Sequence, residues 1–594
     1  MPIQIAEVSV DNPLPHLDRP FDYAIPSDMP VSVGCRVRVR FAGRKVSGYV
    51  LGIKEGERDK RLLDIESLVS DQPALSPEAA RLCRAVADHY AGTLADVLRL
   101  AVPPRHARAE ASPSKPFPEP SLEHPSPLFA AYPYGDSYLS NVKAGGHPRA
   151  VLSLAPVHLE VGSWTEALLE AAQASIEGGR GALLLTPDAK ALDLLAAHAE
   201  SRFGRGTFTT LSADLGPSTR YRHFMAVKRG NVKLVLGTLG AAFAPVQDLG
   251  LVAVFDSGRD TYSFLKAPYP HVREVAMIRS YLEKCALLLA GYSRTAEETE
   301  LVRTRWAAPL KLTPAQNRSI APAVRTALNP VAASRDPLAS GFRLPPAVFE
   351  VTSSALLLGP VLIQVARAGH FEGDAAVSVQ RTAQDLGRAF PGTKVVTSHG
   401  EALVAAVDAE PKLVVATPQA EPQASGGYAA AVILDVDRSL TRADLRVEEE
   451  SLRRWLDVAS MVKPADEGGT VLLVGEPSER VVQALIRLDP VGFSESELAQ
   501  RAEAGFPPVW KLITLEGPEA VVQEAVRQLN APKETRISGP YPLDSEGSVD
   551  SRATLRAPLA LGSELVRAVK AVAAERSSRK LAGPLRVAVD PERI

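Results

Sequence analysis

Two series of short apolar segments, separated by helix-length amphipathic segments, constrain the fold of this chain most. The first series comprises Ala150–Leu154, Ala182–Thr186, Leu234–Leu236, Leu251–Phe255 and Leu287–Ala290, with helices expected at Trp164–Glu177, Ala189–Arg202 and Arg273–Glu283. The second comprises Val361–Val365, Lys394–Thr397, Leu413–Ala416, Val432–Leu434 and Val471–Val474. Continuous apolar strands that alternate with helices are typical of parallel sheets covered on both faces. We therefore expect a multidomain α/β protein with two parallel-sheet lobes, at residues 148–310 and 311–490.

A different pattern precedes these lobes. From Gly34 the segment CRVRVRF alternates strictly, so a strand would send Arg36, Arg38 and Arg40 to one face and the apolar residues to the other. A turn at Ala42-Gly43 and renewed alternation over Lys45–Ile53 predict a hairpin with Arg44 and Lys45 at its tip. Residues 1–107 are thus expected to form a small β-rich domain with a cationic face, ending in a helix from Ser76.

The remaining segments are expected to be a linker and a small terminal domain. Residues 108–147 are rich in proline and serine, which favours a linker. Residues 491–594 are expected to be a small terminal domain that contains GFPPVWKLITLEG, a strand after a proline pair, and closes on LRVAVDPERI.

Two aromatic residues flank a carboxylate in the N-terminal segment. Phe21, Asp22 and Tyr23 lie between Pro20 and Pro26, which favour an extended backbone. Aromatic faces can stack a nucleobase, and a carboxylate can accept a hydrogen bond from a base or a sugar hydroxyl. The same residues also fit an ordinary alternative, in which Phe21 and Tyr23 belong to the core and the arginines guard an edge strand.

Charge, cysteines and hydropathy exclude several classes of protein. The net charge is −2, so any affinity for nucleic acid must come from local patches. The 3 cysteines, Cys35, Cys83 and Cys285, are far apart, which excludes a disulfide framework and a CxxC zinc site. The N-terminal segment PIQIAEVSV has no cationic leader and no long apolar core, so we expect it to be a short strand and no signal peptide. No apolar run is long enough to span a bilayer. We expect a soluble, cytoplasmic protein with no membrane partner.

The segments PLPHLDRPFDYAIP and GCRVRVRFAGRKVSGYVLGI resemble the N-terminal 3′-DNA-binding domain of the PriA family of replication restart proteins. The resemblance continues in order along nearly the whole chain. It implies two RecA-like lobes of the superfamily 2 helicase type, a linker that retains at most a winged-helix remnant within 132–150, and, over residues 491–594, a small α+β C-terminal domain that contacts DNA. It also implies a pocket for the 3′ end of a nascent leading strand, formed by Phe21, Asp22, Tyr23 and Gly43.

The phosphate-binding loop of that family is degenerate here. Against the family pattern GxTGSGKTE, the first glycine position is His158, the last is Ser163, and the lysine position is Trp164. Thr165 keeps the position of a magnesium ligand, but a glycine-rich loop and a lysine are what neutralise nucleotide phosphates. Glu160 adds a negative charge where a triphosphate would lie.

The other catalytic elements of the family are also absent. Phe255 and Asp256 stand where the resemblance implies the first two residues of DEEH, which bind the metal and activate water. After Leu456, the segment Asp457–Pro464 lacks both arginines of the family's arginine-finger motif. The eight zinc-binding cysteines of the family's second lobe are missing as well. We therefore expect no ATP or zinc cofactor and no enzymatic activity.

Three hypotheses about function follow. The preferred one is a replication restart and primosome assembly protein that binds stalled forks and D-loops through a 3′ end, without helicase activity. Its expected partners are DNA, other primosome proteins, the replicative helicase or its loader, and single-stranded DNA-binding protein, and its expected location is the nucleoid. The alternative is an ATP-dependent 3′→5′ DNA helicase with a divergent phosphate loop. The third is a protein-interaction module without affinity for DNA.

Overall fold

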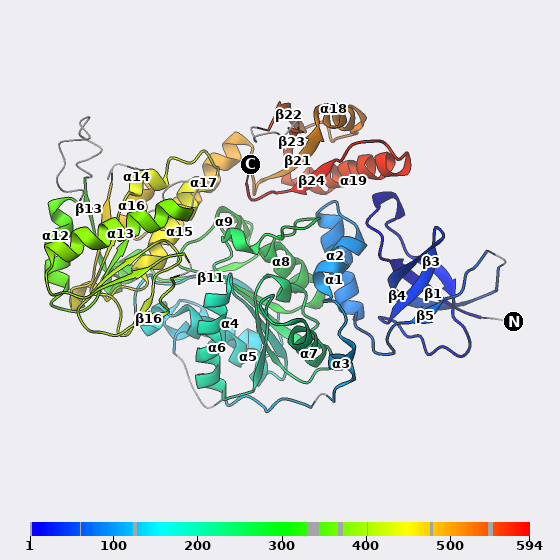
Figure 1. The fold of residues 1–594 in the computed structure, drawn as a ribbon, viewed down its shortest axis with the longest axis horizontal. Coiled ribbons are helices and arrows are strands. Elements are labelled where there is room, and N and C mark those ends of the chain that lie inside the picture. Colours follow the sequence, from blue (N-terminus) through cyan, green and yellow to red (C-terminus); the bar gives the residue numbers. More distant parts are fainter. Residues whose placement is uncertain are drawn as a thin grey trace.

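The computed structural model describes residues 3–59, 61–113, 115–122, 127–328, 344–365, 372–400, 402–475, 479–543 and 550–593. Figure 1 shows a small β-rich domain at the N-terminal end, two α/β lobes, and a small α/β body near the C-terminal end, so the expected multidomain α/β class is confirmed.

The N-terminal domain is a curved antiparallel sheet with the strand order β2-β1-β4-β3-β5. Its strands are β1 (Ile3–Val10), β2 (Phe21–Ala24), β3 (Arg36–Phe41), β4 (Arg44–Gly56) and β5 (Ser67–Leu68). A backbone bridge between Ala24 and Asp64 brings the end of β2 to the chain that leads into β5. The sheet therefore curls around its own core, which includes Val8, Val37, Val39 and Val50.

The predicted hairpin is confirmed. Phe41 pairs with Arg44, so Ala42 and Gly43 form a two-residue turn, and both have positive φ angles of 46° and 79°. Two successive positive φ angles are what a type I′ hairpin turn requires.

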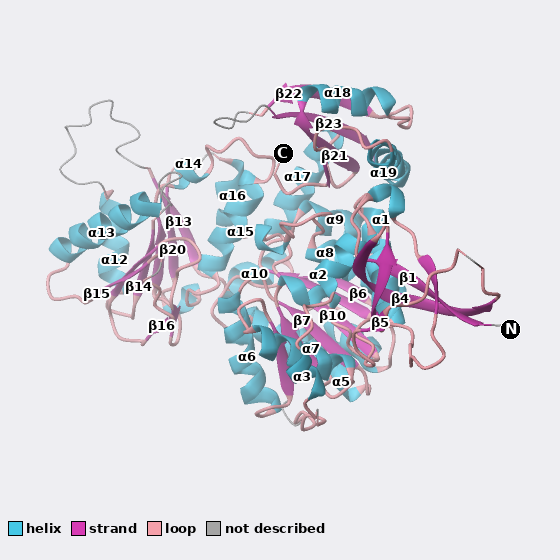
Figure 2. Ribbon diagram, turned by 45° about the vertical axis from the view of Figure 1, so that its right-hand side comes forward, coloured by secondary structure: helices cyan, strands magenta, loops and turns pink. Residues whose placement is uncertain are grey.

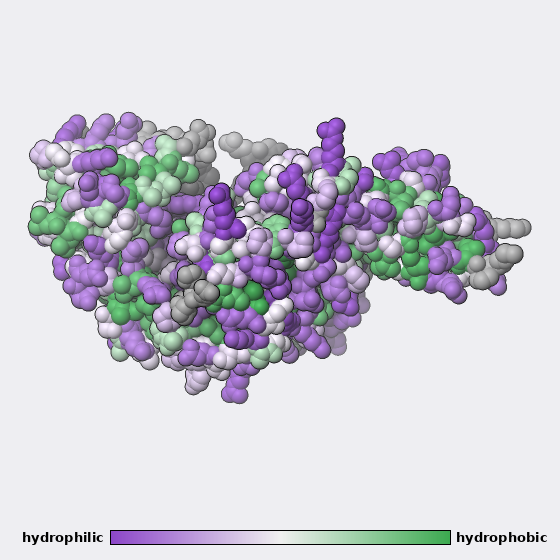
Figure 3. Space-filling view, turned by 90° about the horizontal axis from the view of Figure 1, so that it is seen from below, coloured by the Kyte–Doolittle hydropathy of each residue, from purple (hydrophilic) through white to green (hydrophobic). Residues whose placement is uncertain are grey.

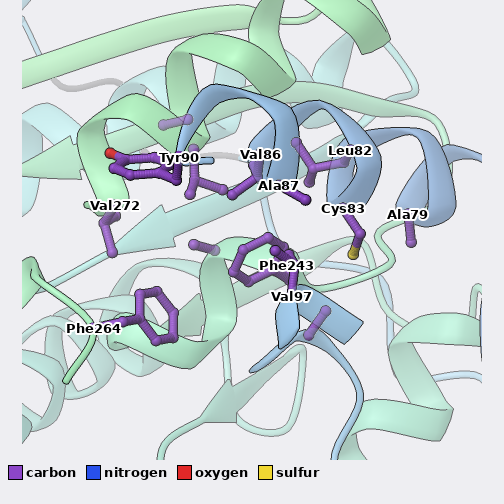
Figure 4. Close-up of a cluster of buried hydrophobic side chains, with 14 of the residues drawn as sticks. Ala79, Leu82, Cys83, Val86, Ala87, Tyr90, Val97, Phe243, Phe264 and Val272 are labelled. Carbon is purple, nitrogen blue, oxygen red and sulfur yellow. The ribbon is translucent and has the colours of Figure 1, made fainter. Parts of the chain in front are cut away.

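Three helices connect this sheet to the first lobe: α1 (Pro77–His89), α2 (Leu94–Ala101) and α3 (Ala107–Ala111). The hydroxyl of Ser76 caps α1 as predicted, accepting from the amide of Ala79. Figure 4 shows Leu82, Val86 and Tyr90 of α1 facing Phe243 and other buried side chains of the first lobe. The N-terminal domain is thus anchored to the lobe by apolar contacts.

The first lobe is a seven-stranded parallel sheet with the order β12-β6-β11-β10-β7-β9-β8. Its strands are β6 (Arg149–Ser153), β7 (Gly181–Leu185), β8 (Phe208–Leu211), β9 (Leu234–Gly237), β10 (Leu249–Phe255), β11 (Ala286–Gly291) and β12 (Ala308–Lys311). Its helices are α4 (Gly135–Lys143), α5 (Trp164–Glu177), α6 (Ala189–Phe203), α7 (Pro217–Lys228), α8 (Val272–Glu283) and α9 (Ala296–Arg303), with short 3-10 turns at η2 (Phe129–Ala131), η3 (Glu160–Gly162), η4 (Leu239–Phe243) and η5 (Asp260–Tyr262).

The segment where a winged-helix remnant was expected is integrated into this lobe. Helix α4 packs against α5, and Phe129 and Tyr138 stack with ring centroids 5.9 Å apart. The hydroxyl of Tyr138 donates to the carbonyl of Leu287 in β11 at 3.1 Å. These residues cover the sheet of the lobe.

The second lobe is a six-stranded parallel sheet with the order β13-β20-β19-β14-β17-β15. Its strands are β13 (Ala323–Ala327), β14 (Val361–Gln364), β15 (Val395–Ser398), β17 (Leu413–Ala416), β19 (Ala430–Ile433) and β20 (Thr470–Val474), and β16 (Ala406–Val407) pairs separately with β18 (Gln423–Ala424). Its helices are α10 (Pro314–Ile320), α12 (Pro346–Ala355), α13 (Glu372–Ala389), α14 (Val436–Ser439), α15 (Val447–Ala459), η6 (Ala465–Glu467) and α16 (Arg480–Ile486). Residues 366–371, which lie where the family carries its zinc module and where we expect that module to be missing, are outside the described residues.

The two lobes share one hydrophobic core. A single cluster of buried side chains contains Leu168 and Leu288 of the first lobe together with Tyr428, Trp455 and Leu456 of the second. The helices of both lobes meet in the middle of the molecule (Figure 2). The lobes are therefore packed as one body.

The C-terminal domain follows α17 (Pro490–Ala504). It is an antiparallel sheet in the order β22-β23-β21-β24, formed by β21 (Trp510–Pro518), β22 (Arg536–Pro542), β23 (Asp550–Pro558) and β24 (Arg586–Val589), with α18 (Glu519–Gln528), η7 (Leu559–Leu561) and α19 (Gly562–Ser578). In Figure 1, α19 extends toward the N-terminal domain.

Polar and apolar side chains are interspersed on the face of the molecule seen in Figure 3. Among the described residues, none of the helices is both long enough and apolar enough to cross a membrane.

Candidate nucleic-acid interface and degenerate nucleotide site

Strand β2 separates the three side chains that were expected to form one pocket. Because successive residues of a strand face opposite sides, Phe21 and Tyr23 point to the inside of the curved sheet and Asp22 points outward. Tyr23 is 3% exposed, and its hydroxyl donates to the carbonyl of Arg40 at 3.2 Å. The expectation that Tyr23 stacks a base is therefore wrong for this structure, and the alternative that Tyr23 is a core residue is confirmed.

The accessible aromatic surface lies instead at the mouth of the sheet. Phe21 meets Phe41 edge to face, with ring centroids 4.8 Å apart, and both side chains are half-buried. The guanidinium carbon of Arg19 lies 5.1 Å from the centroid of Phe21. An aromatic pair beside a guanidinium group suits stacking against a base. Sequence reasoning missed Phe41, although it is the last apolar residue of the alternating strand.

Asp22 is exposed beside a basic residue on the neighbouring part of the sheet. Lys54 of β4 places its Nζ atom 2.9 Å from Asp22 and 3.0 Å from Glu7. The hydrogen bonds to Asp22 and Glu7 raise the pKa of Lys54 above its ordinary value. Both side chains of the Asp22–Lys54 pair are 46% exposed, so a ligand can reach the pair and compete for it. Lys54 is thus a cation at the predicted site that the sequence did not identify.

The arginines of β3 alternate as predicted, but most of the expected cationic face is already paired. Arg36 donates to the hydroxyl of Tyr49 from Nε at 3.1 Å and lies over its ring. Arg40 and Lys45 share the carboxylate of Glu66 at 3.1 and 3.0 Å. These contacts reduce the positive charge that the face can offer to phosphates.

Arg38 and Arg44 remain available on this face. Both side chains are exposed, and neither forms an ion pair with a described residue. Gly43 is exposed in the turn between β3 and β4 and has a positive φ that favours glycine. Of the five basic residues that were predicted on this face, only Arg38 and Arg44 therefore remain as candidate phosphate contacts.

Several amide groups of the loop that follows β6 donate hydrogen bonds to carbonyl groups of the same loop. The amide groups of Val157, Leu159, Gly162 and Ser163 each donate to a carbonyl within residues 155–160 at 2.9 Å. The amide of His158 donates to the carbonyl of Val462 in the second lobe at 3.0 Å. Phosphate-binding loops require such amide groups to point at the ligand. This loop uses them for its own structure.

The positions expected for the catalytic lysine and the metal-binding aspartate hold one aromatic pair. Trp164, at the start of α5, stacks on Phe255, at the end of β10, with centroids 4.1 Å apart and an interplanar angle of 13°. Tyr292 meets Phe255 edge-on at 6.2 Å and donates from its hydroxyl to the carbonyl of Gly162 at 2.8 Å. Apolar contacts thus occupy the place where charges would face a nucleotide.

The hydroxyl groups of Ser163 and Thr165 form hydrogen bonds with neighbouring groups of the protein. The hydroxyl of Ser163 caps α5 by accepting from the amide of Glu166. Thr165 is 2% exposed, and its Oγ1 atom lies 3.1 Å from Ser163 Oγ and 3.0 Å from His198 Nδ1. A magnesium ion could not reach this hydroxyl without disturbing the helix N-terminus.

Asp256 forms a buried ion-pair network between the lobes. It accepts from Arg259 at 2.6 Å and from Arg453 of α15 at 2.9 Å, and Arg259 also reaches Asp457 of α15 at 3.1 Å. Burial opposes ionisation of Asp256, but the two guanidinium groups outweigh it and hold the pKa of Asp256 below its ordinary value. Burial, followed by repulsion from Asp256, raises the pKa of Asp457 to about 7.

Arg453 was missed because the family's arginine motif is expected after Leu456, whereas Arg453 lies one turn earlier on α15. It brings a guanidinium group from the second lobe to Asp256 of the first. In this structure that guanidinium group is committed to an interlobe ion pair.

A second buried network joins the lobes to the segment after β24. Arg446 of the second lobe lies 2.5 Å from Glu297 of the first lobe and 3.5 Å from Glu592. Arg501 of α17 pairs with Glu449 of α15 at 2.8 Å. Removing one partner of a buried ion pair leaves an uncompensated charge, which costs about 3–5 kcal/mol. The lobes are therefore fixed relative to each other by charge as well as by the shared core.

Comparisons with known proteins cover both ends and nearly the full length of the chain. Residues 7–103 match the family described as 3′DNA-binding domain (3′BD), and residues 502–592 match the family described as Primosomal protein N C-terminal domain. The chain is 38% identical to the probable replication restart proteins PriA of Mycobacterium tuberculosis and Mycobacterium leprae, with 98% of this chain and 99% of each relative aligned. It is 26% identical to the replication restart protein PriA of Bacillus subtilis over 22% of this chain and 16% of that protein.

Solved structures to which the chain is similar include RecG bound to a three-way DNA junction, at a TM-score of 0.37 and 12% identity, covering 60% of this chain and 47% of that one. Another is the DUF1998 helicase MrfA bound to DNA, at a TM-score of 0.37 and 10% identity, covering 63% of this chain and 55% of that one.

Proposed function

Because the chain belongs to the PriA family of replication restart proteins, we propose that it binds stalled forks and D-loops that carry a free 3′ end, and that it does so without unwinding DNA. The N-terminal domain supplies the end site at the start of β2, where the Phe21–Phe41 pair lies on one side of the strand and Asp22, paired with Lys54, lies on the other. Arg38 and Arg44 contact the phosphates that lead to that end. The lobes act as a fixed scaffold at the nucleoid.

The observation that carries the non-catalytic part of this proposal is the stack of Trp164 on Phe255. Phosphoryl transfer depends almost entirely on positioning and on charge that stabilises the transition state. An indole and a phenyl ring supply neither, and five amide groups of the adjacent loop, those of residues 157–159, 162 and 163, are already bonded. We propose that the protein neither binds ATP productively nor uses zinc.

The scaffold part of the proposal rests on the fixed lobes. A body that holds a fork in one geometry can present it to the replicative helicase or its loader, to other primosome proteins, and to single-stranded DNA-binding protein. We propose these as its protein partners because of the family to which the chain belongs.

The experiment compares a labelled fork with a free 3′ leading-strand end and the same fork with that end blocked. Wild type is measured beside Asp22→Ala and beside Asp28→Ala, which removes an exposed carboxylate elsewhere in the same domain. We expect wild type and Asp28→Ala to prefer the free end, and Asp22→Ala to lose the preference. Equal binding of both forks by wild type would refute the end site.

A parallel assay separates this proposal from the helicase alternative. Forks are incubated with ATP and magnesium, and unwinding is compared with that of a relative whose motor motifs are intact. We expect no ATP-dependent unwinding and no change in the fluorescence of Trp164 on titration with ATP and magnesium. Unwinding at the relative's rate would overturn the non-catalytic assignment.

A further inference from the structure

The loop between β1 and β2 touches the C-terminal domain, although the two are more than 500 residues apart in sequence. Its 3-10 turn η1 (Pro15–Leu17) packs against α19. His16 Nδ1 lies 2.8 Å from Ser577 Oγ on that helix. The loop is therefore held on one side by a domain that the sequence order does not bring near it.

Asp18 joins three elements at this contact. Its side chain is 8% exposed and lies 2.7 Å from Lys570 Nζ of α19 and 3.0 Å from Arg84 Nη1 of α1. It also accepts from the amide of Leu94 at the start of α2, at 2.8 Å. Burial opposes ionisation, yet Arg84 and Lys570 hold the pKa of Asp18 below its ordinary value. The carboxylate is thus charged at neutral pH and bonded on three sides.

Asp18 lies close to the proposed end site along the chain. Only Arg19 and Pro20 separate it from Phe21 at the start of β2. Pro20 restricts both its own φ and the conformation of Arg19, so little slack remains between Asp18 and β2. Arg19 itself lies over the ring of Phe21. A shift of Asp18 is therefore passed on to Phe21 and Asp22.

We propose that Lys570 of the C-terminal domain is a positioning residue for the DNA-end site, acting through Asp18 on strand β2. Lys570 is 22% exposed and also lies 3.2 Å from Asp88. It has no need to touch DNA in order to act. This inference rests on the proposed function, and it adds that the two ends of the chain form one DNA-binding unit.

The test uses the full chain with Lys570→Met, the conservative variant Lys570→Arg, and the control Arg567→Met. Arg567 is exposed one turn away on α19, and its Nε donates to the carbonyl of Ser563 in the same helix, so the control removes the same charge without touching Asp18. The first readout is the ratio of affinities for forks with free and blocked 3′ ends. The second is hydrogen exchange of residues 14–24 without DNA.

We expect Lys570→Met to lower the affinity ratio by at least about fivefold, the lower range of coupling between two sites. Lys570→Arg and Arg567→Met should keep the wild-type ratio. Exchange of residues 14–24 should be faster in Lys570→Met than in Arg567→Met, with unchanged exchange in the core of the lobes. If Lys570 had only a structural role, Lys570→Met would lower the thermal stability of the protein. The ratio of affinities for forks with free and blocked 3′ ends, measured on the folded protein, would stay unchanged.

The two failures are distinguishable. If Lys570→Met keeps the wild-type ratio, or if its exchange over residues 14–24 equals that of Arg567→Met, the positioning role is overturned while the end site stands. If wild type itself shows no preference for a free end, the proposed end site fails and Lys570 has no end site to position.

Discussion

Replacing Trp164 with alanine tests whether the former nucleotide site has become part of a structural core. Complete removal of a buried tryptophan costs about 3–5 kcal/mol, and a well-placed aromatic pair adds about 0.5–1.5 kcal/mol beyond area burial. Trp164 is half-buried and stacks on Phe255 at 4.1 Å. We therefore expect Trp164→Ala to lower the free energy of unfolding by about 3 kcal/mol. This value is about half of the cost of removing a fully buried tryptophan, plus the energy of the lost stack.

The assay is thermal unfolding of the full chain followed by circular dichroism. In a cooperative unit of more than about 250 residues, each kcal/mol moves the midpoint by about 1–2 °C, so Trp164→Ala should lower it by about 3–6 °C. A double-mutant cycle with Phe255→Leu should give a coupling energy of about 0.5–1.5 kcal/mol. The control is Trp306→Ala, which removes a tryptophan that stacks with Arg149 outside the interlobe core. Its coupling to Phe255→Leu should be close to zero.

Stabilisation of the protein by ATP and magnesium through Trp164 would refute this interpretation. A nucleotide bound at a concentration of about 100 times its Kd stabilises a protein by about 2.7 kcal/mol. If millimolar ATP and magnesium raised the midpoint of wild type by several degrees, and if Trp164→Ala abolished that rise without lowering the midpoint in the absence of ATP, Trp164 would be a nucleotide contact. The interpretation of the stack as a structural replacement would then be wrong.

Three further outcomes are expected. Arg38→Ala combined with Arg44→Ala should weaken fork binding and reduce the slope of log affinity against log salt by about 1.5, because about 0.7–0.9 of a counterion is released per phosphate contact; binding is titrated between low and moderate salt. Asp457→Asn should flatten the dependence of the unfolding midpoint on pH. Because the pKa of Asp457 is raised to about 7 in the folded state, its protonation stabilises the fold below about pH 4, and this stabilisation is lost as the pH rises to about 7. Phe41→Leu should reduce the free-end preference by roughly 1–3 kcal/mol, the typical loss of one stacked base, whereas Tyr23→Phe should leave it unchanged in the same fork assay.

The sequence predicted elements well wherever the periodicity of apolar residues was strong. Helix α5 begins and ends where expected, at Trp164 and Glu177, and the alternation in β3 placed its arginines on one face. Strand β8, with the sequence FTTL, and helix α7, with arginines and a histidine spread around its axis, were missed because neither shows a clear apolar face. Short polar strands at a sheet edge give little periodic signal.

The candidate site was predicted less well because its chemistry depends on contacts between distant segments. The sequence identified β2 but placed Tyr23 in the pocket, since flanking prolines indicate an extended chain and not which side faces the core. Lys54, 32 positions after Asp22, approaches it through the pairing of β1 with both β2 and β4. The approach of Arg453 to Asp256 and that of Lys570 to Asp18 depend on tertiary packing alone.

The core shared by the two lobes also affects how such a protein is controlled. Moving the lobes apart would expose apolar side chains of the cluster that both lobes contribute to, at a cost of about 25 cal/mol per Å² of apolar surface exposed. Breaking the Asp256–Arg453 pair would add to that cost. An internal opening and closing cycle is therefore a poor means of regulation for this fold. Control by the supply of DNA ends, by the concentration of partners and by the number of copies in the cell requires no such movement.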